Sequence, residues 1–297
     1  MNWKRYKTLP DKEKRQDIYY IIGLDIGNDS SAIAFYNTVD GVPEIIDLSG
    51  GYGRPTIPTA MQYIVENKEW VFGEYAIQNM GVGKEVTLKD LIERLGNSEY
   101  IDIDNKPISV INLLGMYIKE LMSNVKNINP KAEIAGIVAS VPSYFSTQAK
   151  DELKRAFKNA GYEKELIDLV SDRQCVFAYA EIKKGEKSLL IDYGAREVRG
   201  GVYSAESENQ LKSLSSLFED TIGTRIIDEE VKKLFTDYYI ANNPLAARQG
   251  TDLDKGIKDQ IATFTYQHQE ILFQKAIRSK PAKLYNFKKT GKRKKVF

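Results

Sequence analysis

A short pattern that occurs twice constrains the fold of this chain more than any other feature of its sequence. The segments IIGLDIGNDSSAIAFY and SLLIDYGAREVRGGVY both run from an apolar, β-rich stretch through Asp-x-Gly into a second β-rich stretch. They align without a gap at a constant separation of 167 residues (192 minus 25), which pairs Asp25 with Asp192, Gly27 with Gly194 and Tyr36 with Tyr203. Because two β-rich runs joined by a glycine-bearing turn predict a β-hairpin, we expect two copies of a hairpin-containing unit.

The segments between and after the two hairpins alternate between helical and strand patterns, which favours an α/β fold. Apolar residues recur with the helical period of about 3.6 over residues 110–125, and the continuous apolar run at 134–141 is typical of a covered strand. Ser146 is expected to cap a helix that ends before Gly161. By the same criteria we expect a loop at 49–58, strands at 62–65, 69–72 and 166–170, and helices at 86–95, 174–184, 226–240 and 252–277.

The composition excludes several classes of protein and of site. Hydrophobic residues make up 42% of the chain and charged residues 28%, as in ordinary globular proteins. No apolar run is long enough for a transmembrane helix, and the first residues lack the apolar core of a secretory signal, so we expect a cytoplasmic protein without a membrane partner. The single Cys175 and the single His268 exclude a disulfide framework and multi-histidine metal sites, and we expect both to be packing or surface residues.

The net charge of +2 conceals an asymmetry along the chain. Residues 271–297 contain 10 lysines and arginines and no acid, which leaves −8 on the other 270 residues (33 basic minus 41 acidic). Because the body of the chain is acidic, binding to nucleic acid is not expected, and the basic end KKTGKRKK is interpreted as a solvated tail.

The two hairpin turns have the chemistry of a phosphate site. A glycine in the turn lets the backbone approach an oxygen closely, and successive turn amides can form an anion-binding nest. Asp25 and Asp192 end their strands, where a carboxylate can hold a hydrated magnesium ion. Two such turns facing each other would grip one phosphate chain from both sides, whereas the plain alternative is a pair of ordinary turns with capping carboxylates.

Together with further segments, these turns resemble the nucleotide-binding domain of the seventy-kilodalton heat-shock chaperones (DnaK-type), members of the actin-like ATPase superfamily. Residues 23–35 resemble the first phosphate loop of that family, and residues 138–162 resemble its Val-Pro-x-Tyr-Phe segment and the helix that follows. The other matching segments, within about residues 18–285, are RPTIPTAMQYI, VFGEYA, VTLKDLIERLG, LVSDRQCVFAYAE, LLIDYGAREVRGGVY and DTIGTRIIDEEV.

The resemblance implies an actin-like (ribonuclease-H-like) α/β fold with two lobes, ATP or ADP as ligand and Mg²⁺ as cofactor. Its parts would be a flexible extension (1–17), a first lobe with the first phosphate loop (18–187), an incomplete second lobe with the second loop (188–287) and the basic tail (288–297). It implies catalytic roles for Asp25, Lys89, Asp172 and Asp192, with Asp25 and Asp192 holding the metal through water. Nucleotide contacts would fall to Gly27, Asn28, Asp29, Gly194, Arg199, Gly223 and Thr224.

Several residues depart from the family pattern at these loops. In the second loop Glu197 replaces a threonine and Arg199 an aspartate, and in the first loop Asn28 and Asp29 replace two threonines. Glu197 and Arg199 share one face of a strand, so either Arg199 contacts phosphate in place of magnesium charge, or it pairs with Glu197 in a degraded site. The sequence also ends before the family's adenosine-binding glycine motif, so we expect a truncated second lobe. Further departures are Arg173 for proline, Lys150 for arginine and Thr224 for glycine.

These features predict a heat-shock-chaperone-like ATP-binding protein, a weak or slow ATPase involved in protein folding. The alternative, which the changed second loop favours, is a non-catalytic nucleotide-sensing or interaction protein that acts with a partner chain. A filament-forming relative of actin is a third hypothesis, against which the Val-Pro-x-Tyr-Phe match argues. Because Ile257, Ile261 and Phe264 need a partner surface, we expect self-association or capture by another chain through residues 250–287.

Overall fold

The computed structural model describes residues 19–37, 41–48, 53–80, 85–128, 130–131, 133–180, 182–207, 210–219, 222–243, 257–258, 260–265, 288–289 and 292–293. These residues form a mixed α/β structure, which confirms the predicted class, while the two-lobed actin-like arrangement stays a prediction. One compact unit comprises Met1–Ile77, Val86–Leu190 and Gly200–Ser216, and a second comprises Gln78–Glu85, Ile191–Arg199 and Leu217–Phe297. Within the described ranges, no helix has the length and apolar character needed to cross a membrane.

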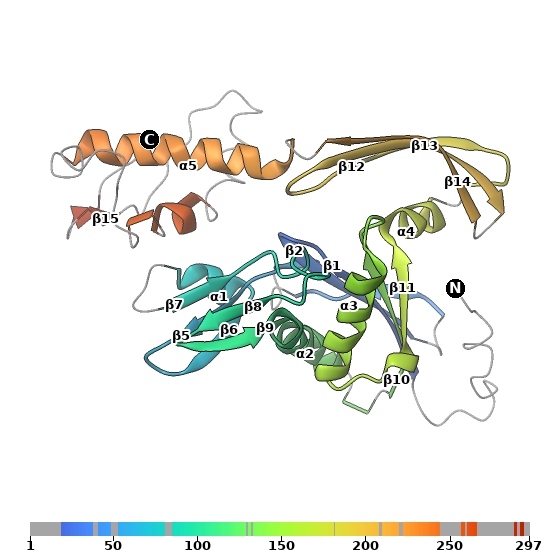
Figure 1. Cartoon of the computed structure of the whole chain (residues 1–297), viewed down its shortest axis with the longest axis horizontal. Coiled ribbons are helices and arrows are strands. Elements are labelled where there is room, and N and C mark those ends of the chain that lie inside the picture. Colours follow the sequence, from blue (N-terminus) through green and yellow to red (C-terminus); the bar gives the residue numbers. More distant parts are fainter. Residues whose placement is uncertain are drawn as a thin grey trace. The chain divides into compact units, whose positions relative to one another are not determined.

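The main sheet of the first unit is built around the first predicted hairpin (Figure 1). β1 (Tyr19–Ile26) pairs antiparallel with β2 (Ser30–Asn37) and, on its other side, parallel with β10 (Glu133–Val141). β11 (Ile167–Ser171) lies parallel to β10, and β3 (Pro43–Ile45) and β4 (Thr56–Pro58) both pair with β2. The first predicted hairpin and the predicted strands at 134–141 and 166–170 are therefore confirmed.

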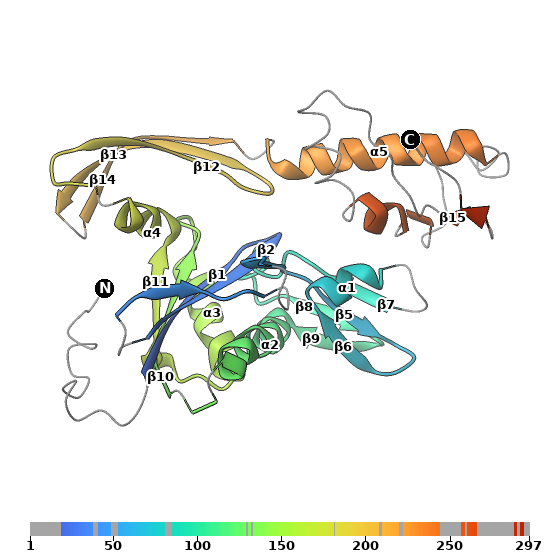
Figure 2. The same cartoon turned by 180° about the vertical axis from the view of Figure 1, so that it is seen from behind.

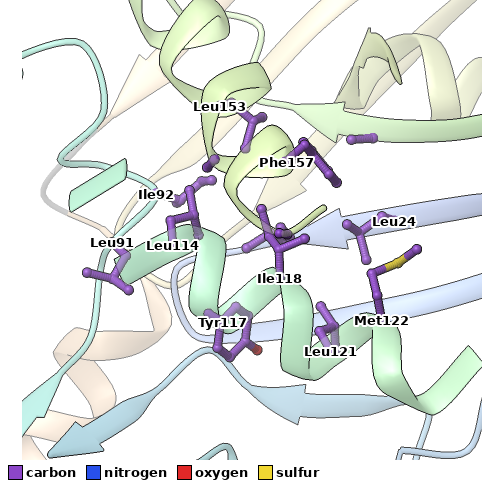
Figure 3. Packing of buried hydrophobic residues seen from close by; sticks show 14 of the residues in the cluster. Leu24, Leu91, Ile92, Leu114, Tyr117, Ile118, Leu121, Met122, Leu153 and Phe157 are labelled. Carbon is purple, nitrogen blue, oxygen red and sulfur yellow. The ribbon is translucent and has the colours of Figure 1, made fainter. Parts of the chain in front are cut away.

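Two helices pack together and against this sheet (Figures 1 and 2) to form the core. They are α2 (Val110–Ile128) and α3 (Thr147–Asn159), and both were expected from their apolar periodicity. Leu24 of β1 belongs to one buried cluster with Ile118 of α2 and Phe157 of α3 (Figure 3). The helices approach closely at Gly115, where a Cβ would lie 2.9 Å from the Cβ of Asn159, so a larger residue would force them apart.

The ends of two helices follow from local capping. The Ser146 hydroxyl accepts a hydrogen bond from the Ala149 amide at 3.1 Å, and Gly161 follows the end of α3 with a φ of +96°, as predicted for a cap and a stop. α4 (Asp172–Tyr179) starts two residues earlier than the helix predicted at 174–184, because Ser171 and Gln174 form a capping box, and it ends earlier than predicted, at Tyr179. Ser171 is therefore the cap of this helix, and Asp172 is its first residue.

The region 86–95 was predicted as a helix, and this prediction is wrong. β7 (Glu85–Leu88) is a strand in the small sheet with β5 (Met61–Ile64) and β6 (Glu69–Phe72), and turns occupy residues 91–98. The β-branched residues of β7 suit a strand, and Asp90, at a φ of 60°, leaves helical geometry. The predicted strands at 62–65 and 69–72 are confirmed, whereas the expected loop at 49–58 contains β4. The short α1 (Glu74–Gln78) follows β6.

A further hairpin of the first unit, formed by β8 (Tyr100–Ile103) and β9 (Lys106–Ser109), was not predicted. The two strands pair antiparallel around Asp104 and Asn105. These two residues have φ values of 53° and 61°, which are the positive values of the tight turn that suits hairpin twist. Asp and Asn are among the residues that tolerate this geometry, so the Asp-Asn pair was the available sequence signal.

The second predicted hairpin consists of β12 (Lys187–Tyr193) and β13 (Val198–Ser207). It forms a three-stranded sheet with β14 (Gln210–Glu219), which pairs with β13. Its first strand is covered differently from the matching strand of the first copy. Leu189 and Ile191 of β12 are 68% and 64% exposed, whereas the equivalent Ile22 and Leu24 of β1 are 0% and 3% exposed. The duplication therefore extends to the hairpin but not, among the described residues, to the elements that bury it.

The helix predicted at 226–240 is α5 (Thr224–Asn242), which Gly223 precedes. Of the helix expected at 252–277, the described residues 257–258 and 260–265 are helical, and the others, Ile271 among them, lie outside the described residues. Ile261 and Phe264 are buried against Phe235 of α5, so these apolar side chains have a partner surface within the chain. In the predicted solvated tail, β15 (Lys288–Lys289) and β16 (Lys292–Arg293) form a short antiparallel pair.

Candidate functional site

The turn between β1 and β2, which we call the first loop (residues 27–30), is closed by its own backbone. The Gly27 amide donates to the Ser30 carbonyl oxygen at 3.0 Å, and the Thr59 amide donates to the Asp29 carbonyl oxygen at 2.9 Å. A Cβ at Gly27 would lie 2.8 Å from the Ser30 oxygen, so the turn requires glycine here. The loop thus brings two successive amides, those of Asn28 and Asp29, to the tip of a tight turn, an arrangement that suits an anion.

A hydroxyl cluster lies buried behind the first loop. The Tyr117 hydroxyl donates to the Ser31 hydroxyl at 3.1 Å and lies 3.2 Å from the Pro58 carbonyl oxygen, and the hydroxyls of Ser31 and Thr59 are 2.8 Å apart. Burial, only partly offset by the hydrogen bonds to Ser31 and Thr59, raises the pKa of Tyr117 to about 12. Tyr117 is therefore neutral near pH 7 and supports the strand that leaves the loop.

The carboxyl ends of the parallel strands gather acidic and hydroxyl side chains at one edge of the sheet. Asp25 is exposed near the end of β1, and the hydroxyl of its register partner Ser140 donates to its carboxylate. Asp172 follows β11 directly and begins α4. Burial, with the negative charges of Asp25 and Asp172, raises the pKa of the Cys175 thiol. The edge of an open α/β sheet where strands end is a usual ligand position, and Asp25 and Asp172 share it.

The fit of this edge to magnesium rests on its exposed carboxylate. Among the described residues, no group of three or more His, Cys, Asp and Glu side chains could hold a metal ion directly. Magnesium commonly keeps several of its waters and takes one or two carboxylates in addition. Asp25, exposed at a strand end, fits that kind of contact, and the Ser140 hydroxyl fixes one of its oxygens.

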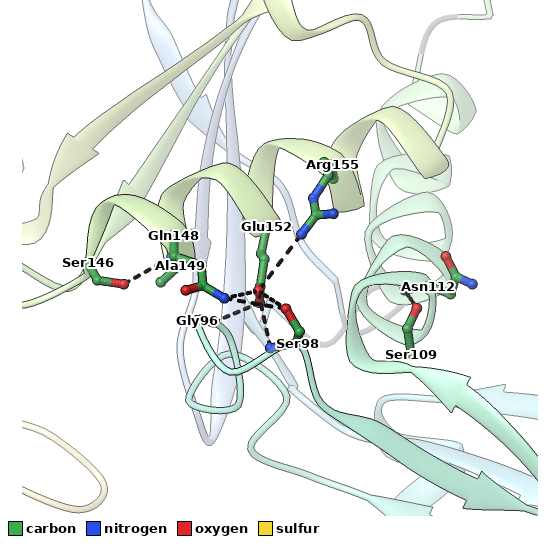
Figure 4. Close-up of polar contacts among 9 residues, drawn as sticks. All are labelled: Gly96, Ser98, Ser109, Asn112, Ser146, Gln148, Ala149, Glu152 and Arg155. Atoms are coloured by element: carbon green, nitrogen blue, oxygen red, sulfur yellow. Dashed lines mark hydrogen bonds and ion pairs between the residues drawn. The ribbon is translucent and has the colours of Figure 1, made fainter.

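Lys89 lies just after β7, whereas the sequence predicted that it would lie on a helix. The turns that follow it are anchored to α3 by the buried Glu152 (Figure 4). Its carboxylate accepts hydrogen bonds from the Gly96 amide at 2.7 Å and from the Ser98 amide and Gln148 side chain at 3.2 and 3.1 Å. Burial by itself would raise the pKa of Glu152, but these hydrogen bonds outweigh it and hold the pKa below its usual value.

Glu152 is a residue that the sequence analysis missed. It lies on the face of α3 that also carries the buried Ala149, Leu153 and Ala156. An acid within an apolar helical stripe was the available signal, because a buried charge must have hydrogen-bond partners.

The turn between β12 and β13, which we call the second loop (residues 194–197), closes in the same way as the first. The Gly194 amide donates to the Glu197 carbonyl oxygen at 2.9 Å, which repeats the bond from Gly27 to Ser30 at the matching positions. The carbonyl oxygens of Gly194 and Ala195 accept hydrogen bonds from the amides of Thr224 and Arg225, the first residues of α5, at 3.1 and 2.8 Å. This helix end therefore braces the second loop.

The charged departures in the second loop and just after it contact each other. Glu197 and Arg199 form an ion pair, and the buried Arg199 guanidinium lies 6.0 Å from the centre of the Phe218 ring. The pairing of Arg199 with Glu197, one of the two alternatives drawn from the sequence, is thus present. Asp192 at the end of β12 is exposed.

The residues expected at the site fall into two groups. The first unit contains Asp25, Gly27, Asn28, Asp29, Lys89 and Asp172, and the second contains Asp192, Gly194, Arg199, Gly223 and Thr224. Within the first group, the side-chain amide nitrogen of Asn28 donates a hydrogen bond of 2.6 Å to the Glu93 carboxylate. This bond joins the first loop to the turns after Lys89. That the two groups face one another across a ligand stays a prediction.

Comparison with known proteins gives both a family and distant relatives. The model of a family described as "Family of unknown function (DUF5716) C-terminal" matches residues 42–195. The chaperone protein DnaK of Thermosipho africanus (strain TCF52B) is 26% identical over 227 residues, which cover 72% of this chain and 36% of that protein. DnaK of Thermotoga petrophila is 26% identical over 178 residues, or 59% of this chain and 29% of the relative. The chain thus spans about a third of the length of these relatives and is distantly related to them.

Proposed function

We propose a function for this chain, which belongs to the DUF5716 C-terminal family, a family of unknown function. From its distant relation to DnaK, we propose that it is a chaperone-like ATP-binding protein with weak or slow ATPase activity. The observation that carries the proposal is the pair of equivalent loops, each closed by an amide-to-carbonyl bond from its Asp-x-Gly glycine. A repeated turn of this kind suits the phosphate groups of a nucleotide.

The residues of the first unit have distinct roles in this proposal. The amides of Asn28 and Asp29 contact phosphate oxygens, and Lys89 acts as a point charge toward them. Asp25 holds Mg²⁺ through water, and Asp172 orients the water that attacks. When bound, Mg²⁺ supplies positive charge against the phosphates. In the second unit, Asp192 and Gly194 belong to the proposed phosphate site. Gly223 and Thr224 support the second loop.

Slow hydrolysis follows from the chemistry of the second loop. Phosphoryl transfer depends almost entirely on positioning and on charge stabilisation. Loss of one positioned group from such a site costs on the order of a hundredfold in rate. Glu197 in the second loop and Arg199 just after it replace two groups of the related family. Nucleotide affinity is weak and falls with salt, because the proposed phosphate contacts are largely electrostatic.

A second candidate function is nucleotide sensing without hydrolysis, in concert with a partner chain. The ion pair between Glu197 and Arg199 favours it, because the two charges offset each other and neither residue belongs to the related family's phosphate-loop pattern. Self-association through residues 250–287 belongs to the same proposal. Ile261 and Phe264 pack on Phe235 of α5, so these two side chains are not available for it.

Calorimetry with ATP and ADP, with and without magnesium, tests the proposal. We expect binding that weakens with added salt, and Asp25→Asn should weaken the magnesium-dependent part about tenfold, which is about 1.4 kcal/mol. Asp102→Asn, a change of the same kind at an exposed position of β8, should leave binding unaltered. In a separate assay of ATP hydrolysis, turnover that Asp192→Asn abolishes would favour the ATPase over the nucleotide sensor without hydrolysis. Absence of binding at millimolar nucleotide would refute both.

A further inference from the structure

We infer that Glu93 is a positioning residue for the first loop, which it holds in its anion-binding shape through the side chain of Asn28. The inference rests on the proposed function. The side-chain amide nitrogen (Nδ2) of Asn28 donates to a Glu93 carboxylate oxygen at 2.6 Å, although the two residues are 65 positions apart in the sequence. A hydrogen bond to a charged acceptor is stronger than one between neutral groups.

The orientation of the Asn28 side chain depends on this bond. A carboxylate can only accept, so the nitrogen of the amide must point toward Glu93. The amide oxygen of Asn28 is then buried and has no hydrogen-bond partner in the described part of the chain. Within that part, Glu93 thus provides the hydrogen bond that anchors the side chain at the tip of the loop.

Glu93 is itself held in place from the other side. Its amide donates to the Asp90 carbonyl oxygen at 3.2 Å, within the turns that follow Lys89. Those turns are fixed to α3 by the bonds from Gly96 and Ser98 to Glu152. The turns at residues 91–98 are therefore bonded to a packed helix at one end and to the first loop at the other.

The loop is consequently held at two points of its tip. The Asp29 carbonyl oxygen accepts from the Thr59 amide, and the Asn28 side chain is tied to Glu93. The first tether uses backbone and would survive most substitutions, whereas the second is made by two side chains. Because the proposed phosphate contacts are the amides of Asn28 and Asp29, loss of the side-chain tether lets these amides move and lowers their affinity for an anion.

The test is a double-mutant cycle with Asn28→Ala, Glu93→Ala and the combined variant, read out by hydrogen exchange of residues 27–30 and by calorimetry with ADP. Glu93→Ala should speed exchange of the loop amides and weaken ADP binding about fivefold to tenfold, and the double variant should be no worse. Glu93→Gln keeps an acceptor oxygen and should restore both quantities to within about twofold. Asn97→Ala, an exposed change in the same turns, is the matched control.

The outcomes separate the tether from the function on which it rests. If Glu93→Ala lowers the melting temperature but leaves exchange of the loop amides unchanged, its role is only structural and the inference is overturned. The inference also fails if the effects of the two single substitutions add. If the unaltered chain does not bind ADP, the proposed function fails, and the exchange arm still decides whether Glu93 holds the loop.

Discussion

Replacing Glu152 by glutamine should destabilise the first unit by about 3 kcal/mol, although the two side chains have nearly the same shape. Glu152 is 1% exposed and accepts from the Gly96 amide with one oxygen and from Ser98 and Gln148 with the other. An amide retains one oxygen, so its NH₂ group must face at least one of these donors. Loss of a hydrogen bond to a charged group costs about 1.5–3 kcal/mol, and the remaining bonds become weaker neutral ones.

The ion pair with Arg155 adds little to this value. Its nitrogen lies 3.8 Å from the Glu152 oxygen and the Arg155 side chain is 49% exposed, so solvent screens the attraction. A loss of about 3 kcal/mol corresponds to a fall in melting temperature of about 6–12 °C for a unit of this size. Thermal unfolding followed by circular dichroism at pH 7 measures it. Asp151→Asn, the same change at the exposed neighbouring position of α3, should stay within about 0.5 kcal/mol.

Acid pH gives an independent check of the same reasoning. The hydrogen bonds hold the pKa of Glu152 below its ordinary value of 4.5 despite its burial, so the folded state favours the charged form. The stability that this contributes is present above about pH 4.5 and is lost as the pH falls through the folded pKa. The difference in unfolding free energy between the unaltered chain and the Glu152→Gln variant should therefore become smaller at acid pH. Equal stability of the two proteins at pH 7, or a gap independent of pH, would refute the argument.

Three further predictions concern stability. Leu24→Ala should cost about 2–5 kcal/mol and Ile191→Ala, at the equivalent but exposed position of the second copy, at most about 1 kcal/mol, as measured by urea unfolding. Tyr117→Phe should cost about 1 kcal/mol at pH 9, but since burial raises the Tyr117 pKa to about 12 from an unfolded value near 10, the gap should vanish near pH 11 in the same assay. Gly223→Ala should cost about 1–3 kcal/mol and speed hydrogen exchange at the start of α5, because its Cβ would overlap the backbone of Ala195 and Arg196; unchanged exchange would contradict this.

The elements that the sequence predicted well are those with a strong local signal. The strands of the first hairpin, the α2 helix and the Ser146 cap depend on periodicity and on hydrogen bonds between residues close in sequence. The equivalence of the two loops was also visible, and it extends to the bond that closes each turn. The prediction at 86–95 failed because a short segment with mixed apolar spacing suits either a helix or a strand. Pairing within the small sheet decided it.

The candidate site also combines features that the local sequence predicted with features that only the tertiary structure determined. The types and spacing of residues in the sequence were enough to select Asp25, Gly27 and their counterparts as candidates, since strand ends and glycine turns are local features. Tertiary structure alone brought Asn28 to Glu93, buried Glu152 beneath the Lys89 segment, and covered β1 while leaving Leu189 of the equivalent β12 exposed. Each of these depends on contacts between distant segments. Whether a side chain is buried and which partner it meets are set by the surface packed against it, which a local pattern does not contain.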